Sequence, residues 1–568
     1  MNIKTAVAAM SVLASTGAFA DFNINLDLSG KPMRDLSKTT SKAIVGYISA
    51  MHAYGDDYWF VSNKYETASV MKKAGCYNTA TWSSDQWFAR RNDPNPKNRT
   101  NPKAQFDFWK QNGFKVLIGL SPIGPKQAAD EKVFKSIVDD KVGFVKWIID
   151  NGYKDVVQGF ELGCETYYMP YDRQDALIKL WTALVPEILK IWPKCPMGVP
   201  VAENFELNPD IKQVRNRMLA AGEIKRDTYF AAAAFNQYSA YFIMGLATNN
   251  VLDKISHVTY HTYGTETPYS CSYYGFQRFR NFIEAYPQLK GKNYWLTEVR
   301  LRSDEDNRCQ RIFRETLLWS HYALTALCQP ETDALLQHQA SSLSGTIYQS
   351  TGKSWAVQWM DGAKWGSREI PDRAAPYDMP RLEVGAMGVL YRLFTEAIMD
   401  HPQFLAHGTS KVRDAEDTFF TSARVTDQVY KHRRAIIEGT PKDQAPKVDG
   451  EVEWVAAHGS GELCLLMVNT KSTPETFRVT VKDKRFYAPV YRTLSCPEEF
   501  VDCRAIPGDG PVWRQASWEE TQFGVSHIPM EAYSNLKPKC DVLTVSIAPN
   551  TVQTVTVPLA NPPKPDKK

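Results

Sequence analysis

The sequence predicts an α/β protein with two main parts, a (β/α)8 TIM barrel and an accessory β-sandwich. Strand and helix patterns alternate from about residue 41 to residue 401, and short alternating strands replace the helices after that. A single strand with period-two alternation, Asp21–Leu28, precedes the barrel. The chain of 568 residues is also too long for one ordinary core. An open doubly wound sheet is the alternative, but it lacks a glycine fingerprint after the first strand.

Residues 1–20 have the pattern of a secretory signal peptide. Lys4 supplies the charged start, Thr5–Phe19 forms an apolar run, and Ala18, Phe19 and Ala20 make a small-x-small cleavage site. The run is too short to span a bilayer, and no later run is long enough. We therefore expect an exported protein, periplasmic or extracellular, without a membrane span.

The barrel strands are predicted from short apolar runs separated by helical patterns. The predicted strands are Ala43–Ser49, Gly75–Thr81, Phe114–Leu120, Val156–Gly163, Met197–Ala202, Ile255–Tyr260, Tyr294–Thr297 and Ala334–Gln339. Predicted helices between or after them include Lys132–Asp150, Asp172–Ile191, Asn307–Leu327 and Pro380–Met399.

The sandwich strands follow residue 401 and are separated by Gly, Pro and Asn turns. They are Val452–Ala457, Glu462–Val468, Thr476–Val481, Val542–Ile547 and Thr551–Val557. We expect Asp21–Leu28 to join them, because no strand follows it at hairpin distance. The predicted division is a signal peptide over 1–20, an N-terminal strand region over 21–40, the barrel over 41–401, the sandwich over 402–560 and a disordered tail over 561–568.

Composition and motifs exclude several classes of function. The formal charge is only +4 with acids and bases interleaved, so nucleic acid is not the expected partner. The nucleotide P-loop and the H-E-x-x-H, G-x-S-x-G and C-x-x-C patterns are missing, and we expect no metal and no cofactor. The oligomeric state stays open. The ten cysteines suit an oxidising compartment, with Cys496–Cys503 and Cys271–Cys309 as disulfide candidates.

Two predicted strands end at a glutamate, which is unusual because ionised acids are costly to bury. Val156–Glu165 reads V-V-Q-G-F-E-L-G-C-E, and Asn293–Glu298 reads N-Y-W-L-T-E. Reacting groups in barrels of this kind sit at the C-terminal ends of the strands. We therefore expect Glu165 and Glu298 to end the fourth and seventh strands and to meet across the barrel mouth.

Other polar and aromatic side chains follow the same rule. His261 and Tyr263 end the sixth predicted strand, Asn204 follows the fifth, and Asn78 and Trp82 lie at the second. A pair of carboxyl groups about 5–5.5 Å apart is what hydrolysis of a glycosidic bond with retention requires. The abundant aromatic residues, 15 Trp and 27 Tyr, either stack on sugar rings or simply fill a large core.

These residues resemble the clan of retaining (β/α)8 glycosidases, with Gly-x-Glu after strand four, His-x-Tyr on strand six and Glu at the end of strand seven. The sandwich built from both termini is similar to that of the heparanase-like β-glucuronidases, the xylosidase/iduronidase group and the arabinofuranosidases. The resemblance implies that Glu298 is the nucleophile and Glu165 the acid/base. It also implies that Tyr263 hydrogen-bonds Glu298 and that His261 lines the sugar pocket.

One residue departs from the clan pattern. The clan usually has Asn directly before the acid/base, where it holds the sugar 2-hydroxyl, whereas this chain has Cys164. A thiol is a weak hydrogen-bond donor. Either another group such as Asn204 takes that duty, or the barrel binds carbohydrate without cleaving it. Glu161 is an alternative acid, and any of these glutamates could instead be a solvated surface residue.

Two loops bear on the substrate. Ser83–Lys103 contains Asp85, Trp87 and Phe88 together with several basic residues, so it either offers charge and rings to an acidic (uronic or sulfated) sugar or is a solvated loop. Ser341–Pro380 is long and Trp-rich, and a hairpin at Thr346–Trp359 is predicted to wall the cleft.

Overall fold

The computed structural model describes residues 22–37, 45–48, 78–82, 85, 88, 102–166, 169–201, 233–264, 287–301, 313–338, 348–350, 382–384, 386–410, 451–495 and 538–561. The predicted signal peptide, Asn204, both candidate disulfides and the C-terminal tail beyond residue 561 lie outside these ranges. At Asn78, Trp82 and Tyr263 the backbone is described but the side chain is not.

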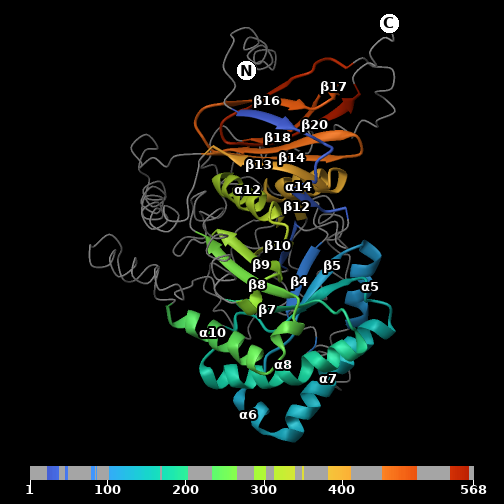
Figure 1. Ribbon diagram of the computed structural model, residues 1–568. Coiled ribbons are helices and arrows are strands. Elements are labelled where there is room, and N and C mark those ends of the chain that lie inside the picture. The colour runs from blue at the N-terminus through green and yellow to red at the C-terminus, as the bar shows by residue number, and fades with distance from the viewer. Residues whose placement is uncertain are drawn as a thin grey trace, which may run out of the picture.

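Parallel strands close into a barrel in the order β10-β3-β4-β5-β6-β7-β8-β9, which confirms the predicted fold class (Figure 1). Its strands are β3 (Val45–Ile48), β4 (Asn78–Trp82), β5 (Lys115–Gly119), β6 (Val157–Glu161), β7 (Met197–Val201), β8 (His257–Gly264), β9 (Asn293–Leu301) and β10 (Thr332–His338). Every strand run predicted for the barrel overlaps one of them. A closed barrel leaves no edge strand, so the backbone groups of each strand pair on both sides.

Helices pack around the barrel on its outside. They are α5 (Pro102–Asn112), α6 (Pro125–Ala129), α7 (Glu131–Asp150), α8 (Tyr171–Ile191), α10 (Ala233–Thr248), α12 (Phe313–Leu327) and α14 (Ala386–Asp400), with short 3-10 turns η4 (Leu252–Lys254) and η6 (Pro287–Leu289). Helix α7 begins after Asp130, whose side chain accepts hydrogen bonds from the backbone N–H groups of Lys132 and Val133, both at 3.0 Å.

The helix predicted over Pro380–Met399 is wrong in its first part. Leu382–Val384 forms strand β12, which pairs antiparallel with β11 (Tyr348–Ser350). The Leu-Glu-Val run alternates with period two, and its backbone hydrogen bonds are made to β11 instead of along a helix. Strand β11 is the described part of the hairpin predicted at Thr346–Trp359; the rest of that hairpin lies outside the described residues.

The sandwich packs two sheets against each other and contains the N-terminal strand, as predicted. One sheet has the order β1-β16-β19, in which β1 (Phe22–Leu26) pairs parallel with β16 (Glu475–Val481) and β19 (Leu543–Ile547) lies on the other side. The second sheet has the order β17-β20-β15-β14-β13-β2, and β18 also pairs with β20. Its strands are β2 (Arg34–Asp35), β13 (Gln403–Thr409), β14 (Val452–Gly459), β15 (Glu462–Asn469), β17 (Arg485–Phe486), β18 (Val490–Ser495) and β20 (Thr551–Ala560).

Strand β15 is buried along its whole length because both faces of its sheet are covered. Leu463, Leu465 and Met467 belong to the core between the two sheets. The residues that alternate with them, Cys464, Leu466 and Val468, belong to the core shared with the barrel. Helices α12 and α14 lie between that face of the sheet and the barrel strands (Figure 1). The sandwich is therefore packed onto the barrel through helices α12 and α14.

A buried carboxylate ties these two parts together. Glu453 on β14 accepts hydrogen bonds from Thr325 of α12 at 2.6 Å, and it lies 2.9 Å from His321 Nδ1 and 2.8 Å from His407 Nε2. Burial disfavours the charge of Glu453, but the hydrogen bonds with His321 and His407 lower its pKa to about 2.

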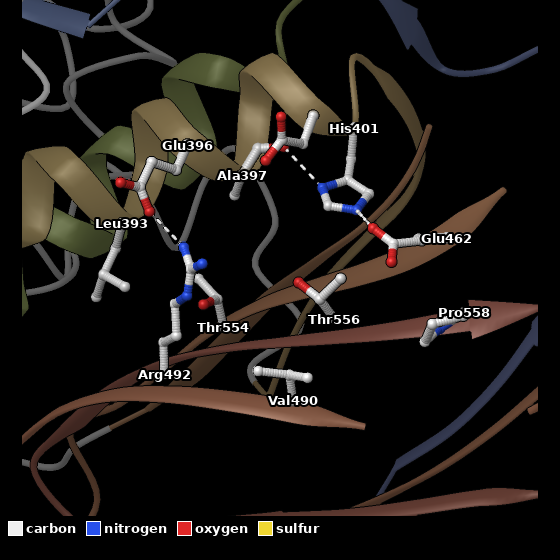
Figure 2. Close-up of a pocket in the computed structure, with 11 residues that line it drawn as sticks. Leu393, Glu396, Ala397, His401, Glu462, Val490, Arg492, Thr554, Thr556 and Pro558 are labelled. Carbon is white, nitrogen blue, oxygen red and sulfur yellow. Dashed lines mark hydrogen bonds and ion pairs between the residues drawn. The ribbon is translucent and has the colours of Figure 1, made fainter. Parts of the chain in front are cut away.

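A second set of polar contacts lies in a small cleft between α14 and the sandwich (Figure 2). Arg492 of β18 forms an ion pair with Glu396, and His401 Nε2 lies 3.5 Å from Glu462 Oε2. These contacts join the end of α14 to β15 and β18.

None of the helices that the structure describes is long and apolar enough to cross a membrane.

We predict that Glu453→Gln lowers the free energy of unfolding by about 2–4 kcal/mol at pH 7, because the substitution removes the acceptor charge from a buried network. The native pKa lies below the ordinary value of 4.5, so the stabilisation is complete above pH 4.5 and is lost as the pH falls toward 2. Urea unfolding of wild type and variant should therefore differ less at pH 3 than at pH 7. Glu131→Gln, at an exposed ion pair, is the control and should change stability by less than about 0.5 kcal/mol. An equal effect of the two substitutions would contradict the assignment.

Candidate active site

The chain leaves strand β6 earlier than predicted. The strand ends at Glu161, and Glu165 lies in the turn that follows it instead of at the strand end. Leu162 N–H still bonds Gly198 O at 2.9 Å, but Gly163 N–H bonds Glu161 O at 3.0 Å and turns the chain. Gly163 and Glu165 both have positive φ, 91° and 48°. Because few non-glycine residues adopt this conformation, the backbone at Glu165 is strained.

The strained turn is anchored from helix α8. The buried Gln174 side chain donates hydrogen bonds to the carbonyl oxygens of Thr166 and Met169, the second at 3.3 Å. Thr166 is itself only 1% exposed. These hydrogen bonds restrain the backbone that follows Glu165 in the chain. They therefore fix the position of the Glu165 side chain at the barrel mouth. The sequence does not indicate that Gln174 supports the site, because a glutamine in the first turn of a helix is usually a surface residue.

A β-bulge positions Glu298. Strand β9 continues to Leu301, so Glu298 lies inside the strand and not at its end as predicted. On the β8 side Thr259 pairs with Trp295 but His261 pairs with Glu298, which leaves one extra residue in β9. The pairing of β9 with β10 shifts at the same place. The extra residue changes the side-chain alternation and turns Glu298 toward His261.

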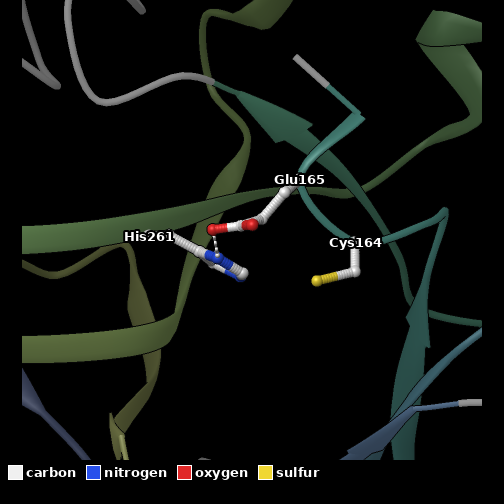
Figure 3. A group of neighbouring side chains, drawn as sticks. All are labelled: Cys164, Glu165 and His261. Carbon is white, nitrogen blue, oxygen red and sulfur yellow. Dashed lines mark hydrogen bonds and ion pairs between the residues drawn. The ribbon is translucent and has the colours of Figure 1, made fainter. Parts of the chain in front are cut away.

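His261 brings the two predicted carboxylates together. Its Nδ1 lies 3.1 Å from Glu165 Oε1 and 3.4 Å from Glu298 Oε2 (Figure 3 shows the first of these contacts). Because both contacts end on the same nitrogen, the two carboxylate oxygens lie no more than about 6.5 Å apart. The side chain of Glu165 is 32% exposed, whereas those of Glu298 and His261 are 9% and 2% exposed. The site therefore has a buried carboxylate and a rim carboxylate.

Glu161 lies below this pair, inside the barrel. It is fully buried, accepts a hydrogen bond from Thr259 Oγ1 at 2.7 Å, and lies 3.9 Å from His261 Nε2. Burial raises the pKa of Glu161 to about 7, although the charge of His261 opposes the shift. Burial also disfavours charge on His261, but Glu298, Glu165 and Glu161 together raise the pKa of His261 to about 9. A cationic His261 thus lies among three carboxyl groups at neutral pH.

Cys164 is a free thiol that packs against the small cluster of apolar side chains in the barrel interior. Burial and the nearby glutamates raise the pKa of the Cys164 thiol well above its usual range. Its sulfur, Glu165 and His261 offer ligand atoms that lie within 4.8 Å of one another (Figure 3). Among the described residues a second group of this kind is His321, Glu451 and Glu453, at the junction with the sandwich.

The barrel interior below the site is filled by Trp295, which is 1% exposed. Its ring stacks on His257 with centroids 4.0 Å apart. The indole fits because β6 and β7 carry glycines at this level: a Cβ at Gly159 would lie 2.2 Å from the ring, and one at Gly198 would lie 2.7 Å from it. This packing makes a solid floor, so the polar groups above it face the C-terminal mouth of the barrel.

Of the predicted site residues, the structure brings Glu165, Glu298, His261 and Cys164 together. Asn78, Trp82 and Tyr263 lie on barrel strands with their side chains undescribed, and Asn204 lies outside the described residues. Thr259, which donates to Glu161, was not among the predicted site residues, although its period-two spacing from His261 places both side chains on one face of the strand.

Within Ser83–Lys103 the structure describes Asp85 and Phe88, which are both buried, and Pro102 and Lys103, which begin helix α5. Asp85 pairs with Lys141 and accepts a hydrogen bond from Ser121 Oγ at 2.9 Å. The ring of Phe88 packs on Phe144 with centroids 5.5 Å apart. Phe88 is therefore a core residue, and neither alternative for this loop, stacking on sugars or exposure to solvent, holds for its ring.

No family model and no curated protein sequence matches this chain. Several solved structures do match this chain. A family 51 α-L-arabinofuranosidase from Bifidobacterium longum has a TM-score of 0.51 and 10% identity, covering 95% of this chain and 100% of that one. A glucosidase from Croceicoccus marinus has a TM-score of 0.49 and 10% identity, covering 95% and 99%. A GH30 endoxylanase from Clostridium papyrosolvens has a TM-score of 0.47 and 12% identity, covering 95% and 99%.

At these identities the likeness shows the fold alone. The arabinofuranosidase, with the only TM-score of these three above 0.5, shares the whole length of its chain with this protein. The resemblance to barrel glycosidases that was expected from the sequence is confirmed at this level. The chain shares its fold with a solved glycosidase, and roles for individual residues have to be argued from the site itself.

We predict that Glu298→Gln lowers the pKa of His261 from about 9 toward its ordinary value of 6.5, because Glu298 supplies the largest of the charges that raise it. The measurement is a pH titration of histidine ring signals in isotopically labelled protein, with His261 assigned from a His261→Asn variant. Glu453→Gln is the matched control, since Glu453 contacts His321 and His407 instead. An unshifted His261 signal in Glu298→Gln would show that the pair is not coupled in solution.

Proposed function

We propose that this protein is an exported retaining glycoside hydrolase in which Glu298 is the nucleophile and Glu165 the acid/base. The observation that supports the proposal is the shared contact of both carboxylates with His261 Nδ1, at 3.4 and 3.1 Å. The two oxygens that share this contact lie no more than about 6.5 Å apart, which is compatible with the separation of about 5–5.5 Å used for retention.

The environments of the two carboxylates suit different roles. Glu298 is nearly buried beside the cationic His261, which keeps a carboxylate ionised and ready to attack the anomeric carbon. Glu165 sits at the rim with a third of its side chain exposed, where a leaving group can depart into solvent. In the first step Glu298 forms the glycosyl ester while Glu165 protonates the leaving oxygen. In the second step Glu165 takes a proton from water, which releases the sugar and frees Glu298.

The proposed substrates are polysaccharides or their fragments, with acidic sugars preferred. The reason is the basic character of the loop Ser83–Lys103, whose arginines and lysines would meet uronic or sulfated groups if the loop borders the mouth. A panel of neutral and uronic aryl glycosides tests this preference separately from the catalytic assignment.

The second candidate function is a carbohydrate-binding protein without catalysis. Cys164 favours it, because the thiol stands where glycosidases of this fold place an amide donor to the sugar. Glycan binding by the wild-type protein without release of product would support this candidate over the first.

We predict that Glu298→Gln lowers kcat on a responsive aryl glycoside by about 10⁴-fold or more, because the amide cannot form the glycosyl ester. A 2-fluoro sugar inactivator with the matching glycone should label Glu298 in the wild type, as seen by peptide mass spectrometry. Glu131→Gln is the control and should retain full turnover, since this residue lies in an exposed ion pair. Undiminished turnover in Glu298→Gln, or a label on another residue, would rule out the assignment.

We predict a different signature for Glu165→Gln. Its kcat/KM should fall by about 10²–10⁴-fold on substrates with poor leaving groups, because general acid catalysis is lost, and much less on dinitrophenyl glycosides. Azide should restore turnover by attacking the glycosyl ester, with a glycosyl azide as the product. Glu161→Gln is the matched comparison, because Glu161 was the alternative acid. Rescue in Glu161→Gln and none in Glu165→Gln would exchange the two roles.

A further inference from the structure

We propose that the barrel mouth binds a soft divalent metal ion such as Zn²⁺ through Cys164, Glu165 and His261, and that the bound metal inhibits the enzyme. The inhibition rests on the proposed function; the binding of the metal does not.

The donor atoms are close to the spacing that a metal requires. One ligand atom from each of Cys164, Glu165 and His261 lies within 4.8 Å of the other two, and Glu165 Oε1 lies 3.1 Å from His261 Nδ1 (Figure 3). Around a tetrahedral Zn²⁺ with bonds of about 2.0–2.3 Å, neighbouring ligand atoms are separated by about 3.3–3.6 Å. Small side-chain movements by the sulfur and the carboxylate are therefore enough to close the site.

The three ligands come from a constrained frame. His261 is fixed on strand β8 and is 2% exposed, and Cys164 packs against the apolar interior that contains Trp295. The Glu165 backbone is held by the bonds of Gln174 to Thr166. Because these residues are already held close together, binding of the metal costs little conformational entropy.

The chemistry of the donors selects the metal. One sulfur, one imidazole nitrogen and one carboxylate oxygen suit Zn²⁺ and similar ions, whereas Mg²⁺ and Ca²⁺ prefer sites made only of oxygen. Glu298 Oε2 lies 3.4 Å from the same His261 nitrogen and can complete the coordination, as can water. Binding requires that the Cys164 sulfur and His261 Nδ1 each release a proton to solvent.

Inhibition follows from the identity of the ligands. A metal on Glu165 prevents that carboxylate from protonating a leaving group, and a metal on His261 Nδ1 breaks the contact that joins it to Glu165. The ion would also occupy the space above Glu298 where the anomeric carbon must lie. Cys164 is the ligand that makes the site, because an amide at this position is a poor ligand for a soft metal.

The test titrates the purified protein with Co²⁺ alone and records sulfur-to-cobalt charge-transfer absorption, then measures Zn²⁺ affinity by calorimetry. We expect the absorption in the wild type, its loss in Cys164→Ser, and at least a ~100-fold weaker Zn²⁺ affinity in that variant. Cys540→Ser is the matched control, since Cys540 is a half-buried free thiol in the sandwich, and it should behave as wild type. The cluster of His321, Glu451 and Glu453 contains no sulfur and adds nothing to this signal.

The second arm measures Zn²⁺ inhibition of aryl glycoside hydrolysis. Wild type and Cys540→Ser should be inhibited, whereas the hydrolysis that remains in Cys164→Ser or Cys164→Asn should be insensitive to the metal. A charge-transfer band without any hydrolysis leaves the metal site standing and rejects the proposed function. Hydrolysis without the band, or a band that persists in both Cys164 variants, overturns the metal site and leaves the proposed function standing.

Discussion

The arrangement of the barrel mouth depends on a buried positive charge at His261. Three carboxyl groups, Glu161, Glu165 and Glu298, lie within 3.9 Å of its ring nitrogens, and the ring is almost inaccessible to solvent. Acids so close together are costly unless a cation compensates them. The histidine supplies that charge and also sets the spacing of the two outer carboxylates, since both contact its Nδ1. The same histidine therefore accounts for both the electrostatic balance of the mouth and the spacing of the carboxylate pair.

Two departures from regular backbone aim the carboxylates at that histidine. Glu165 follows the end of β6 in a left-handed conformation, and Glu298 is turned by an extra residue in β9. Strain and bulges of this kind persist only where surrounding contacts enforce them. Here Gln174 holds the first from helix α8, and the packed floor around Trp295 supports the second. The same rigidity is what gathers the sulfur of Cys164 beside Glu165 and His261.

The sandwich contributes to the barrel by covering its helices. Strand β15 is buried along its length because one face packs on the sheet of β1, β16 and β19 and the other on the side of α12 and α14. Glu453 adds a polar connection at this junction, with partners on α12 and β13. The N-terminal strand β1 joins β16, so segments from both ends of the described chain form one unit. The barrel and the sandwich thus share a continuous core.

The alternation of apolar strands and helices was enough to predict the barrel, because that periodicity reflects burial of each element. The period-two pattern of β1 likewise predicted a place in the sandwich, and acids after apolar strands identified Glu165 and Glu298 as residues of one mouth. Strand ends were predicted less well: β6 stops at Glu161 and β9 continues to Leu301, since turns and bulges depend on neighbouring strands. The central position of His261, the support from Gln174 and the burial of Phe88 were decided only by the tertiary structure. Each of these features depends on contacts between segments that are far apart in the sequence, and the local sequence does not specify those contacts.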